Sequence, residues 1–432
     1  MKPVIFDSLR QTLGHAAARP DNIQWCLTLP AMWSDAAKQA MREAALRAGL
    51  IRNIDSEALS IILEPEAAVL HALENRAPPL SPGETVMILD CGGGTVDTTV
   101  HCCKQGRGQA VLLAEAACAD GALCGAEYVD QHFLDHFREA VGADAFNEWM
   151  QSHPAELAVV MSKWEAIKRS FGGTDASTPE YFDDEELGQI SAVSSRVPIM
   201  PGLHALMSED DNNNLRCEQA SDSDLELTMD CLQAIFSGPV QSTIDLASKQ
   251  LDALSTKCSK VLMVGGFASS PHLQACVRDA LGTRVDAIIV PPHNYAAVLN
   301  GAVLYGCNPE LITARRSRMS YGIKACAPYE EDQLVDRDEG IEHFFIPLYA
   351  SQTRADIELF ATTSKDTKYV VTTDENMKSV GTMHIDLPPS TKEDRVITVT
   401  LTFGKTEITA AAKDESSGLQ ASTRIRFAYR SA

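Results

Sequence analysis

The sequence predicts an α/β protein followed by an all-β region, and three observations support this fold class. Up to residue 314, short apolar runs that suit buried strands alternate with longer stretches that carry apolar residues at helical spacing. Two of the apolar runs end in glycines, at residues 92–94 and 265–266. From Met319 onward, short β-patterned runs follow one another without a helix, which is typical of a β-sandwich of roughly a hundred residues.

The first glycine cluster lies in VMILDCGGGTVDTTV at residues 86–100. Its apolar residues predict a short strand that ends at Asp90, and the β-branched residues after the glycines predict a second strand, so the glycines form a hairpin. Backbone amides can converge on an anion there, and the carboxylates of Asp90 and Asp97 favour Mg²⁺ held mostly through water. A Walker A loop is disfavoured because its lysine and following helix are lacking. A glycine hairpin without a ligand is the alternative.

Before this hairpin, the chain predicts a helix over residues 5–17, a strand over 23–29 and then a helix capped by Ser34. A strand at 61–63 runs into a helix that has Pro65 in its first turn. Glu64 therefore stands at a strand end, where open α/β sheets bind their ligands. A solvated helix cap is an equally good interpretation of this glutamate.

The helical segment MSKWEAIKRSF at 161–171 places three charged residues one turn apart. Glu165, Lys168 and Arg169 fall at i, i+3 and i+4, so they share one side of the helix, either as an exposed ion-paired face or as a site. Residues 171–230 carry 14 acidic residues and 2 arginines, a net charge of −12. We expect exposed, mobile backbone in that acidic segment and assign it no site.

The second glycine cluster follows a strand predicted over 260–264, and Ser269, Ser270 and Pro271 then begin a helix. Something flat or anionic could approach the backbone at this turn. A strand at 286–290 and a helix at 296–305 complete the α/β part. The runs expected as strands in the all-β region are 344–348, 356–361, 369–372, 382–387, 396–403, 406–411 and 423–429.

Composition argues against several partners and settings. A formal charge of −22 and a pI near 4.9 repel nucleic acid and anionic membrane surfaces over long range. The 12 cysteines include no C-x-x-C pair, and the first residues lack the blocks of a signal peptide, so we expect a reducing, cytoplasmic setting. No apolar run approaches the roughly eighteen residues that span a bilayer, so we expect no membrane insertion.

Four motifs, together with the trailing β region, resemble the 70-kilodalton heat-shock chaperones. They are LEPEAA at 63–68, DCGGGTVD at 90–97, EAIKRS at 165–170 and VGGFASSP at 264–271. The stretches at 27–50 and 299–306 are most similar to the heat shock 70 kDa protein 12 branch. The resemblance implies an actin-like (ribonuclease H-like) two-lobed nucleotide-binding domain with its first lobe incomplete, followed by an all-β sandwich. The implied domains are a first-lobe remnant at 1–80, a second lobe at 81–290 that includes the acidic segment 172–230, a return helix and linker at 291–314, and a β-sandwich similar to a substrate-binding domain at 315–432.

The resemblance also implies a site for ATP or ADP with Mg²⁺. Phosphate would be held by Gly92, Gly93, Gly94 and Thr95. Adenine and ribose would lie against Glu165, Lys168 and Arg169, and the nucleoside would be lined from its other side by Gly265, Gly266, Phe267, Ala268 and Ser269. The waters of Mg²⁺ would be held by Glu64 and Asp90, which with Thr95 would form the catalytic set around the γ-phosphate.

The chain departs from the family at its start. The family opens with a hairpin of the form Asp-x-Gly-Thr-Thr, followed by a lysine that orients the attacking water, and Phe6-Asp7-Ser8-Leu9 is no substitute. Because phosphoryl transfer relies on charge stabilisation from all sides, we expect an N-terminally truncated, ATP- or ADP-binding chaperone-like protein whose hydrolysis is impaired or absent. Polypeptide clients or co-chaperones are the implied partners. The alternatives are an adaptor pseudo-ATPase that binds polypeptides without nucleotide and, less favoured, a small-molecule kinase of the same superfamily.

Overall fold

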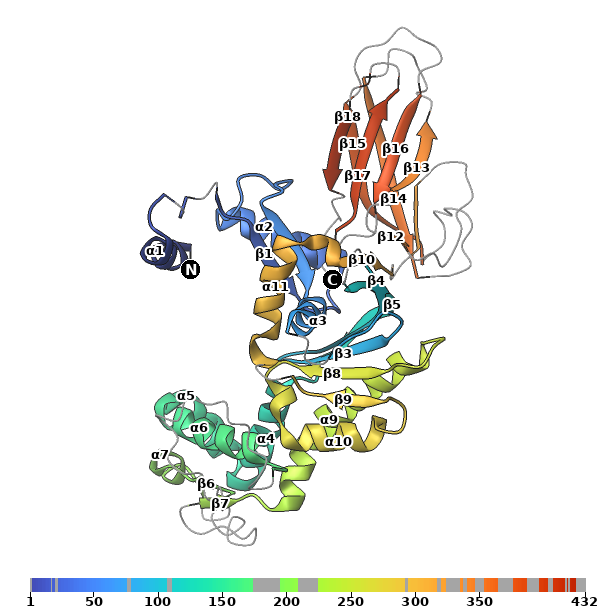
Figure 1. Ribbon diagram of the computed structural model, residues 1–432. Helices are drawn as coiled ribbons and strands as arrows, with labels where there is room; N and C mark the ends of the chain where they lie inside the picture. Colours follow the sequence, from blue (N-terminus) through green and yellow to red (C-terminus); the bar gives the residue numbers. More distant parts are fainter. Residues whose placement is uncertain are drawn as a thin grey trace. The chain divides into compact units, whose positions relative to one another are not determined.

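The computed structural model describes most of the α/β part and short stretches of the all-β region (Figure 1). The described residues are 2–16, 18–19, 22–75, 79–106, 111–173, 195–208, 224–291, 294–316, 320–323, 335–336, 340–345, 353–363, 376–386, 396–402, 407–415, 418 and 420–424. The chain forms two compact units. Unit 1 comprises Met1–Val86, Thr99–Ala119 and Val298–Ala432, and unit 2 comprises Met87–Thr98 and Asp120–Ala297.

The first part of unit 1 contains a pair of parallel strands and several helices. Strands β1 (Trp25–Leu29) and β2 (Leu59–Leu63) pair in register from Trp25↔Leu59 to Leu29↔Leu63. The predicted cap of the second helix is confirmed, because the Ser34 hydroxyl accepts a hydrogen bond from the Ala37 amide at 3.3 Å. The helices are α1 (Lys2–Leu13), α2 (Asp35–Arg47), α3 (Glu64–Glu74), with Pro65 in its first turn as predicted, and α11 (Ala297–Cys307).

A seven-stranded sheet runs in the order β12-β10-β5-β4-β3-β8-β9. Its strands are β3 (Thr85–Cys91), β4 (Val96–Gln105), β5 (Val111–Ala122), β8 (Lys260–Val264), β9 (Ala287–Ile289), β10 (Ile312–Arg315) and β12 (Val335–Asp336). Every residue of β3 is buried, as its apolar run predicts. Strand β8 lies beside β3 in this order, so the two strands that end in glycines are neighbours in the sheet.

The helices of unit 2 pack through a chain of aromatic rings. Phe133 stacks on Trp164 with 4.2 Å between ring centroids, and Phe236 lies 6.5 Å from Trp164. These contacts join α4 (Ala126–Val141), α6 (Pro154–Ser170) and α9 (Met229–Asp252). The remaining elements are α5 (Ala143–Ser152), α7 (Pro201–His204), α10 (Pro271–Leu281), and the 3₁₀ turns η2 (Phe267–Ser269) and η3 (Asn294–Ala296).

The acidic segment is described only in part. Strands β6 (Arg196–Pro198) and β7 (Asp224–Glu226) pair antiparallel within it. Most of the segment on which the expectation of mobile backbone rests, residues 174–194 and 209–223, lies outside the described residues. That expectation therefore stays a prediction.

The all-β region contributes two antiparallel sheets to unit 1. One has the order β11-β14-β15 and the other β13-β16-β17-β18. Their strands are β11 (Ser320–Ile323), β13 (Gly340–Phe345), β14 (Arg354–Thr362), β15 (Lys378–Asp386), β16 (Ile397–Thr402), β17 (Thr409–Asp414) and β18 (Gln420–Arg424). All the expected runs overlap these strands except 369–372, which lies outside the described residues. Packing of the sheets into a sandwich stays a prediction.

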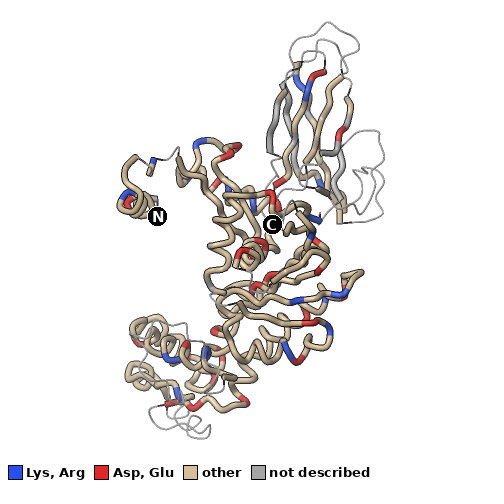
Figure 2. The backbone as a smooth tube through the Cα atoms, in the orientation of Figure 1, with Lys and Arg blue, Asp and Glu red and all other residues tan. Residues whose placement is uncertain are grey.

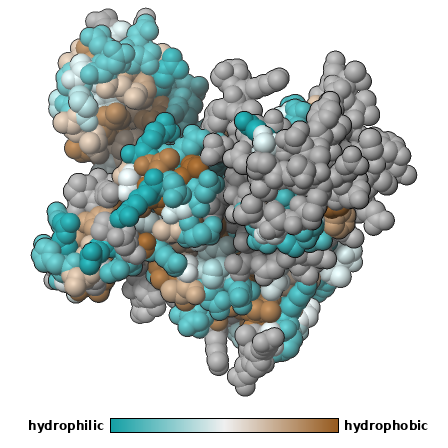
Figure 3. Space-filling model, turned by 90° about the horizontal axis from the view of Figure 1, so that it is seen from above, coloured by the Kyte–Doolittle hydropathy of each residue, from teal (hydrophilic) through white to brown (hydrophobic). Residues whose placement is uncertain are grey.

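The described surface is mixed in charge and polarity. Acidic and basic residues are interspersed along the described backbone in Figure 2. On the face seen in Figure 3, hydrophilic residues cover much of the coloured surface and hydrophobic residues form smaller patches between them. Among the described helices, none has the length and apolar character that crossing a membrane requires.

Candidate functional site

The glycine hairpin predicted from the sequence is confirmed. Strand β3 leads to Asp90, which is 6% exposed, and the Gly92 amide donates to the Thr95 carbonyl at 2.9 Å to close the turn. Strand β4 begins at Val96, immediately after this turn. The hairpin is therefore anchored by two buried strands of the central sheet.

The first turn of α4 fixes the carbonyl side of the hairpin. Amides of Gly125, Ala126 and Glu127 donate to the carbonyls of the three glycines: to Gly94 at 3.4 Å, Gly92 at 3.1 Å and Gly93 at 2.8 Å respectively. Only glycine fits at position 125, because a Cβ there would lie 2.2 Å from the Gly93 oxygen. These hydrogen bonds give the first amides of α4 their acceptors, and they hold the hairpin rigid.

The amide side of the hairpin is open to a ligand. Within the described part of the chain, the amides of Gly93 and Gly94 have no hydrogen-bond partner. A rigid turn that presents successive unpaired amides is a nest suited to an anion. The geometry can therefore bind phosphate without a charged side chain.

Glu127 is a neighbour of the hairpin that sequence reasoning missed. Its carboxylate oxygens lie 3.6 Å and 3.7 Å from where a Cβ of Gly93 and of Gly94 would stand. A carboxylate beside an anion site favours a cation between them. The sequence places Glu127 in the first turn of the helix that follows Gly125. No neighbouring residue, however, indicates that this helix contacts the hairpin.

The second glycine cluster meets the first at Asp90. Gly265 has φ +87°, and a Cβ on it would lie 2.6 Å from Asp90 Oδ1 and 2.5 Å from the Cys91 oxygen. Around Gly266, by contrast, nothing lies within 4 Å of an ideal Cβ, so its surface is open. The turn continues into η2, where Phe267 and Ala268 are buried. Ser269 forms a hydrogen bond with the buried Asn294 side chain at 3.2–3.3 Å.

The charged cluster on α6 also forms as its spacing predicts. Glu165 pairs with Lys168 Nζ at 2.6 Å and with Arg169 Nε at 2.5 Å. Burial would raise the pKa of Glu165, but hydrogen bonds and charge from both cations outweigh it, so the pKa is lowered. Lys168 also contacts Asp130 Oδ1 of α4 at 2.7 Å, and the Trp164 indole donates to the same oxygen at 2.7 Å. Asp130 is a second residue that the sequence did not single out.

The end of α6 adjoins the start of α10, the helix that follows the turn after β8. The Phe171 ring lies 4.5 Å from the His272 ring of α10, and a Cβ on Gly172 would lie 2.8 Å from His272 Cα. Phe267 is linked to the same aromatic group through Phe236, at 6.5 Å between ring centroids. The two segments predicted to contact a nucleoside thus belong to adjoining elements of unit 2.

Glu64 is the one predicted site residue that belongs to unit 1. It is the first residue of α3, directly after β2, as the sequence indicates. Among the described residues, no group of three or more His, Cys, Asp or Glu side chains could hold a metal directly. A Mg²⁺ ion held through water, as predicted, would need fewer protein ligands, and the oxygen-only chemistry of Asp90 and Glu127 beside the open amides fits a hydrated hard cation.

Comparisons with known proteins find similarity to heat-shock proteins. The family model described as Hsp70 protein matches residues 4–179. Human heat shock 70 kDa protein 12B is 26% identical, over 94% of this chain and 71% of that protein, and mouse heat shock 70 kDa protein 12A is 27% identical over the same shares. The chaperone protein DnaK of Anaplasma marginale (strain St. Maries) is 25% identical over 69% of this chain and 40% of its own length.

Proposed function

Because this chain belongs to the 70-kilodalton heat-shock protein family, we propose that it is a chaperone-like protein that binds ATP or ADP with Mg²⁺ at the glycine hairpin of unit 2. The observation that carries the proposal is the pair of open amides at Gly93 and Gly94, on a hairpin held rigid by α4. These amides would bind phosphate, together with Gly92 and Thr95. Similarity to these relatives supports a chaperone-like nucleotide-binding protein, and in this proposal the hairpin would supply the binding chemistry.

The other predicted residues take complementary roles in this proposal. Glu165, Lys168 and Arg169 on α6 would contact adenine and ribose, and residues 265–269 would line the opposite side of the nucleoside. Asp90 and Glu64 would hold waters of Mg²⁺. The bound ion would neutralise charge on the phosphates. A reducing cytoplasm is the setting that suits the 12 cysteines.

We expect a polypeptide of these 432 residues to hydrolyse ATP slowly. These 432 residues include no Asp-x-Gly-Thr-Thr segment that could act as a second phosphate-binding hairpin. Each missing donor to the transferred phosphate costs roughly a hundredfold to a thousandfold in rate. Phosphate release at saturating Mg-ATP tests this expectation, and robust turnover that is abolished by Asp90→Asn would contradict it.

The binding proposal is tested by calorimetry with ADP on the parent protein and on Gly93→Val. The backbone of Gly93 is not in the left-handed region, and its nearest neighbour is the Glu127 carboxylate at 3.6 Å from an ideal Cβ, so the variant should fold. We expect ADP binding to be lost because the side chain would cover the amides. An unchanged thermal melt shows that the fold is intact, and equal affinity in the two proteins would reject the phosphate site.

A second candidate function is polypeptide binding without nucleotide, and one observation favours it. Phe344 on β13, an edge strand of the four-stranded sheet, is 69% exposed. An exposed aromatic side chain on a strand that lies at the sheet edge among the described residues suits β-strand addition by an extended peptide. Binding of a labelled unfolded polypeptide, measured with and without ADP, tests this function. Equal binding under both conditions that is lost in Phe344→Ser would favour the adaptor, whereas retention in Phe344→Ser would reject this edge.

A further inference from the structure

The first turn of α3 contains two glutamates in different surroundings. Glu64 is the first helical residue and is partly exposed, whereas Glu66 is fully buried, at 0% exposure. A buried carboxylate is costly unless it is paired and hydrogen-bonded. We therefore expect Glu66 to have hydrogen-bond and ion-pair partners in the folded protein.

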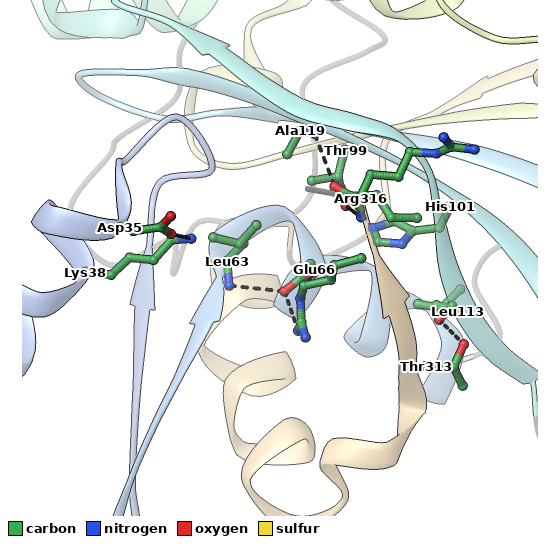
Figure 4. A network of polar contacts seen from close by, with 12 residues as sticks. Asp35, Lys38, Leu63, Glu66, Thr99, His101, Leu113, Ala119, Thr313 and Arg316 are labelled. Carbon is green, nitrogen blue, oxygen red and sulfur yellow. Dashed lines mark hydrogen bonds and ion pairs between the residues drawn. The ribbon is translucent and has the colours of Figure 1, made fainter. Parts of the chain in front are cut away.

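Glu66 closes the turn that contains Glu64. Its Oε2 accepts a hydrogen bond from the Leu63 amide at 3.3 Å (Figure 4). Leu63 is the N-cap of α3 and has no side-chain oxygen to satisfy the first amides. A glutamate at the third helical position that reaches back to the N-cap amide is one half of a capping box, so Glu66 fixes the passage from β2 into α3.

Arg315 holds Glu66 in this position. Its Nε donates to Oε1 at 2.6 Å and its Nη2 donates to Oε2 at 3.0 Å, while the arginine side chain is only 8% exposed. A bidentate pair of this kind fixes the plane of the carboxylate as well as its distance. The guanidinium therefore sets the direction in which Glu66 faces Leu63.

Arg315 is itself anchored by strand β10. Ile312 pairs with Leu113 of β5, the Thr313 hydroxyl donates to the Leu113 carbonyl at 2.9 Å, and the amide of Arg316 donates to Glu115 at 2.5 Å. On α11, Gly301 approaches α3 so closely that a Cβ would lie 1.6 Å from the Ala67 carbonyl oxygen. The first turn of α3 is thus held by β10 and by the close approach of α11.

We propose that Glu66 and Arg315 are positioning residues for Glu64. They hold the Leu63–Glu66 turn so that the Glu64 side chain is presented in one direction at the end of β2. The proposal rests on the Mg²⁺ role proposed for Glu64. Residues that orient a metal ligand from behind typically matter about tenfold to a hundredfold for metal affinity.

The experiment measures the affinity of the full chain for ADP by calorimetry, once with Mg²⁺ and once with EDTA. The ratio of the two affinities reports the metal alone, since a general loss of structure would lower both values together. We expect Glu64→Gln to bring the ratio close to one. Glu66→Gln, which keeps an acceptor for the Leu63 amide but loses the ion pair, should lower the ratio by about tenfold.

Two further variants keep the proposal testable if Glu66→Gln does not fold. Arg315→Lys retains the charge but loses the bidentate geometry, so it should lower the ratio less than Glu66→Gln does. The double variant Glu66→Gln with Arg315→Met removes the unpaired buried charge, and it should fold and still have a low ratio. As a matched control, Lys38→Gln breaks the pair with Asp35 on α2 in the same unit without touching Glu66, Arg315 or β10, and should leave the ratio at the parental value.

The outcomes distinguish a failure of the positioning role from a failure of the proposed nucleotide-binding function. A parent that does not bind ADP would reject the proposed function. If the parent binds and Glu64→Gln lowers the ratio, parental ratios in Glu66→Gln and the double variant would overturn the positioning role even if both variants melt at lower temperature. An unchanged ratio in Glu64→Gln would reject its metal role, and the positioning proposal would fall with it.

Discussion

Two glutamate clusters of this protein use similar charges in opposite surroundings. In unit 1, the side chains of Glu66 and Arg315 are 0% and 8% exposed. In unit 2, the side chains of Glu165 and Arg169 are 39% and 57% exposed. A buried pair that loses one partner leaves a desolvated charge behind, whereas an exposed pair exchanges its partner for water at little cost. The comparison teaches that the buried Glu66–Arg315 pair, the closed cluster, holds structure, whereas Glu165 and Arg169 of the open cluster on α6 can release their partners to a ligand. The third member of the open cluster, Lys168, is only 10% exposed.

The largest effect on stability is expected when one partner of the Glu66–Arg315 pair is removed. Glu66→Leu leaves the Arg315 guanidinium buried without its carboxylate, so the free energy of unfolding should fall by about 3–5 kcal/mol in urea denaturation. Adding Arg315→Met should restore most of this loss. Glu165→Leu in the open cluster should cost at most about 1 kcal/mol. Similar losses for Glu66→Leu and Glu165→Leu would remove the distinction between the clusters.

A smaller effect should separate the two glycines that flank the hairpin site. Gly125→Ala brings a methyl group to 2.2 Å from the Gly93 oxygen, so α4 must shift, at a cost of about 1–3 kcal/mol in stability. Gly266→Ala meets nothing within 4 Å and should leave thermal stability unchanged while lowering affinity for ADP. Full ADP affinity in Gly266→Ala would indicate that the open surface at this glycine does not face the nucleoside.

Lys168 tests whether the open cluster serves a ligand. We expect Lys168→Gln to lower affinity for ADP by about tenfold, since a charged hydrogen bond to ribose would be lost. Because the Lys168 side chain is only 10% exposed, stability should fall as well, by about 1–3 kcal/mol, although Trp164 still donates to Asp130. Lys249→Gln, which breaks the exposed pair with Asp120 in the same unit, is the matched control and should change neither quantity. Parental ADP affinity in Lys168→Gln would assign the cluster a purely structural role.

The smallest effect concerns the dependence of folding stability on acidic pH. The pKa of Glu165 is lowered in the folded protein from an ordinary value of 4.5, so its ion pairs add stability that is fully present above pH 4.5. That contribution is lost as the pH falls through the lowered folded pKa, and solvent screening keeps it small. Urea denaturation above and below this range should show a slightly weaker acid dependence in Glu165→Gln than in the parent. A stronger dependence in the variant would reverse the assigned sign.

Local chemistry let the sequence predict the elements and much of the candidate site. The apolar run before Asp90 and the glycines after it indicated the hairpin, because strand pairing and turn conformation depend on neighbouring residues. Ser34 and Pro65 marked helix starts for the same reason. The i, i+3 and i+4 spacing of the α6 cluster placed its charges together before any tertiary contact was known.

Tertiary structure alone decided which distant groups meet. Gly265 lies beside Asp90 because β8 neighbours β3, and Arg315 pairs with a glutamate 249 residues away because β10 joins the sheet beside β5. Glu127 and Asp130 reach the site only through the packing of α4 on the hairpin and on α6. Neither periodicity nor a short motif encodes strand order, since that order follows from the joint burial of apolar faces contributed by remote segments.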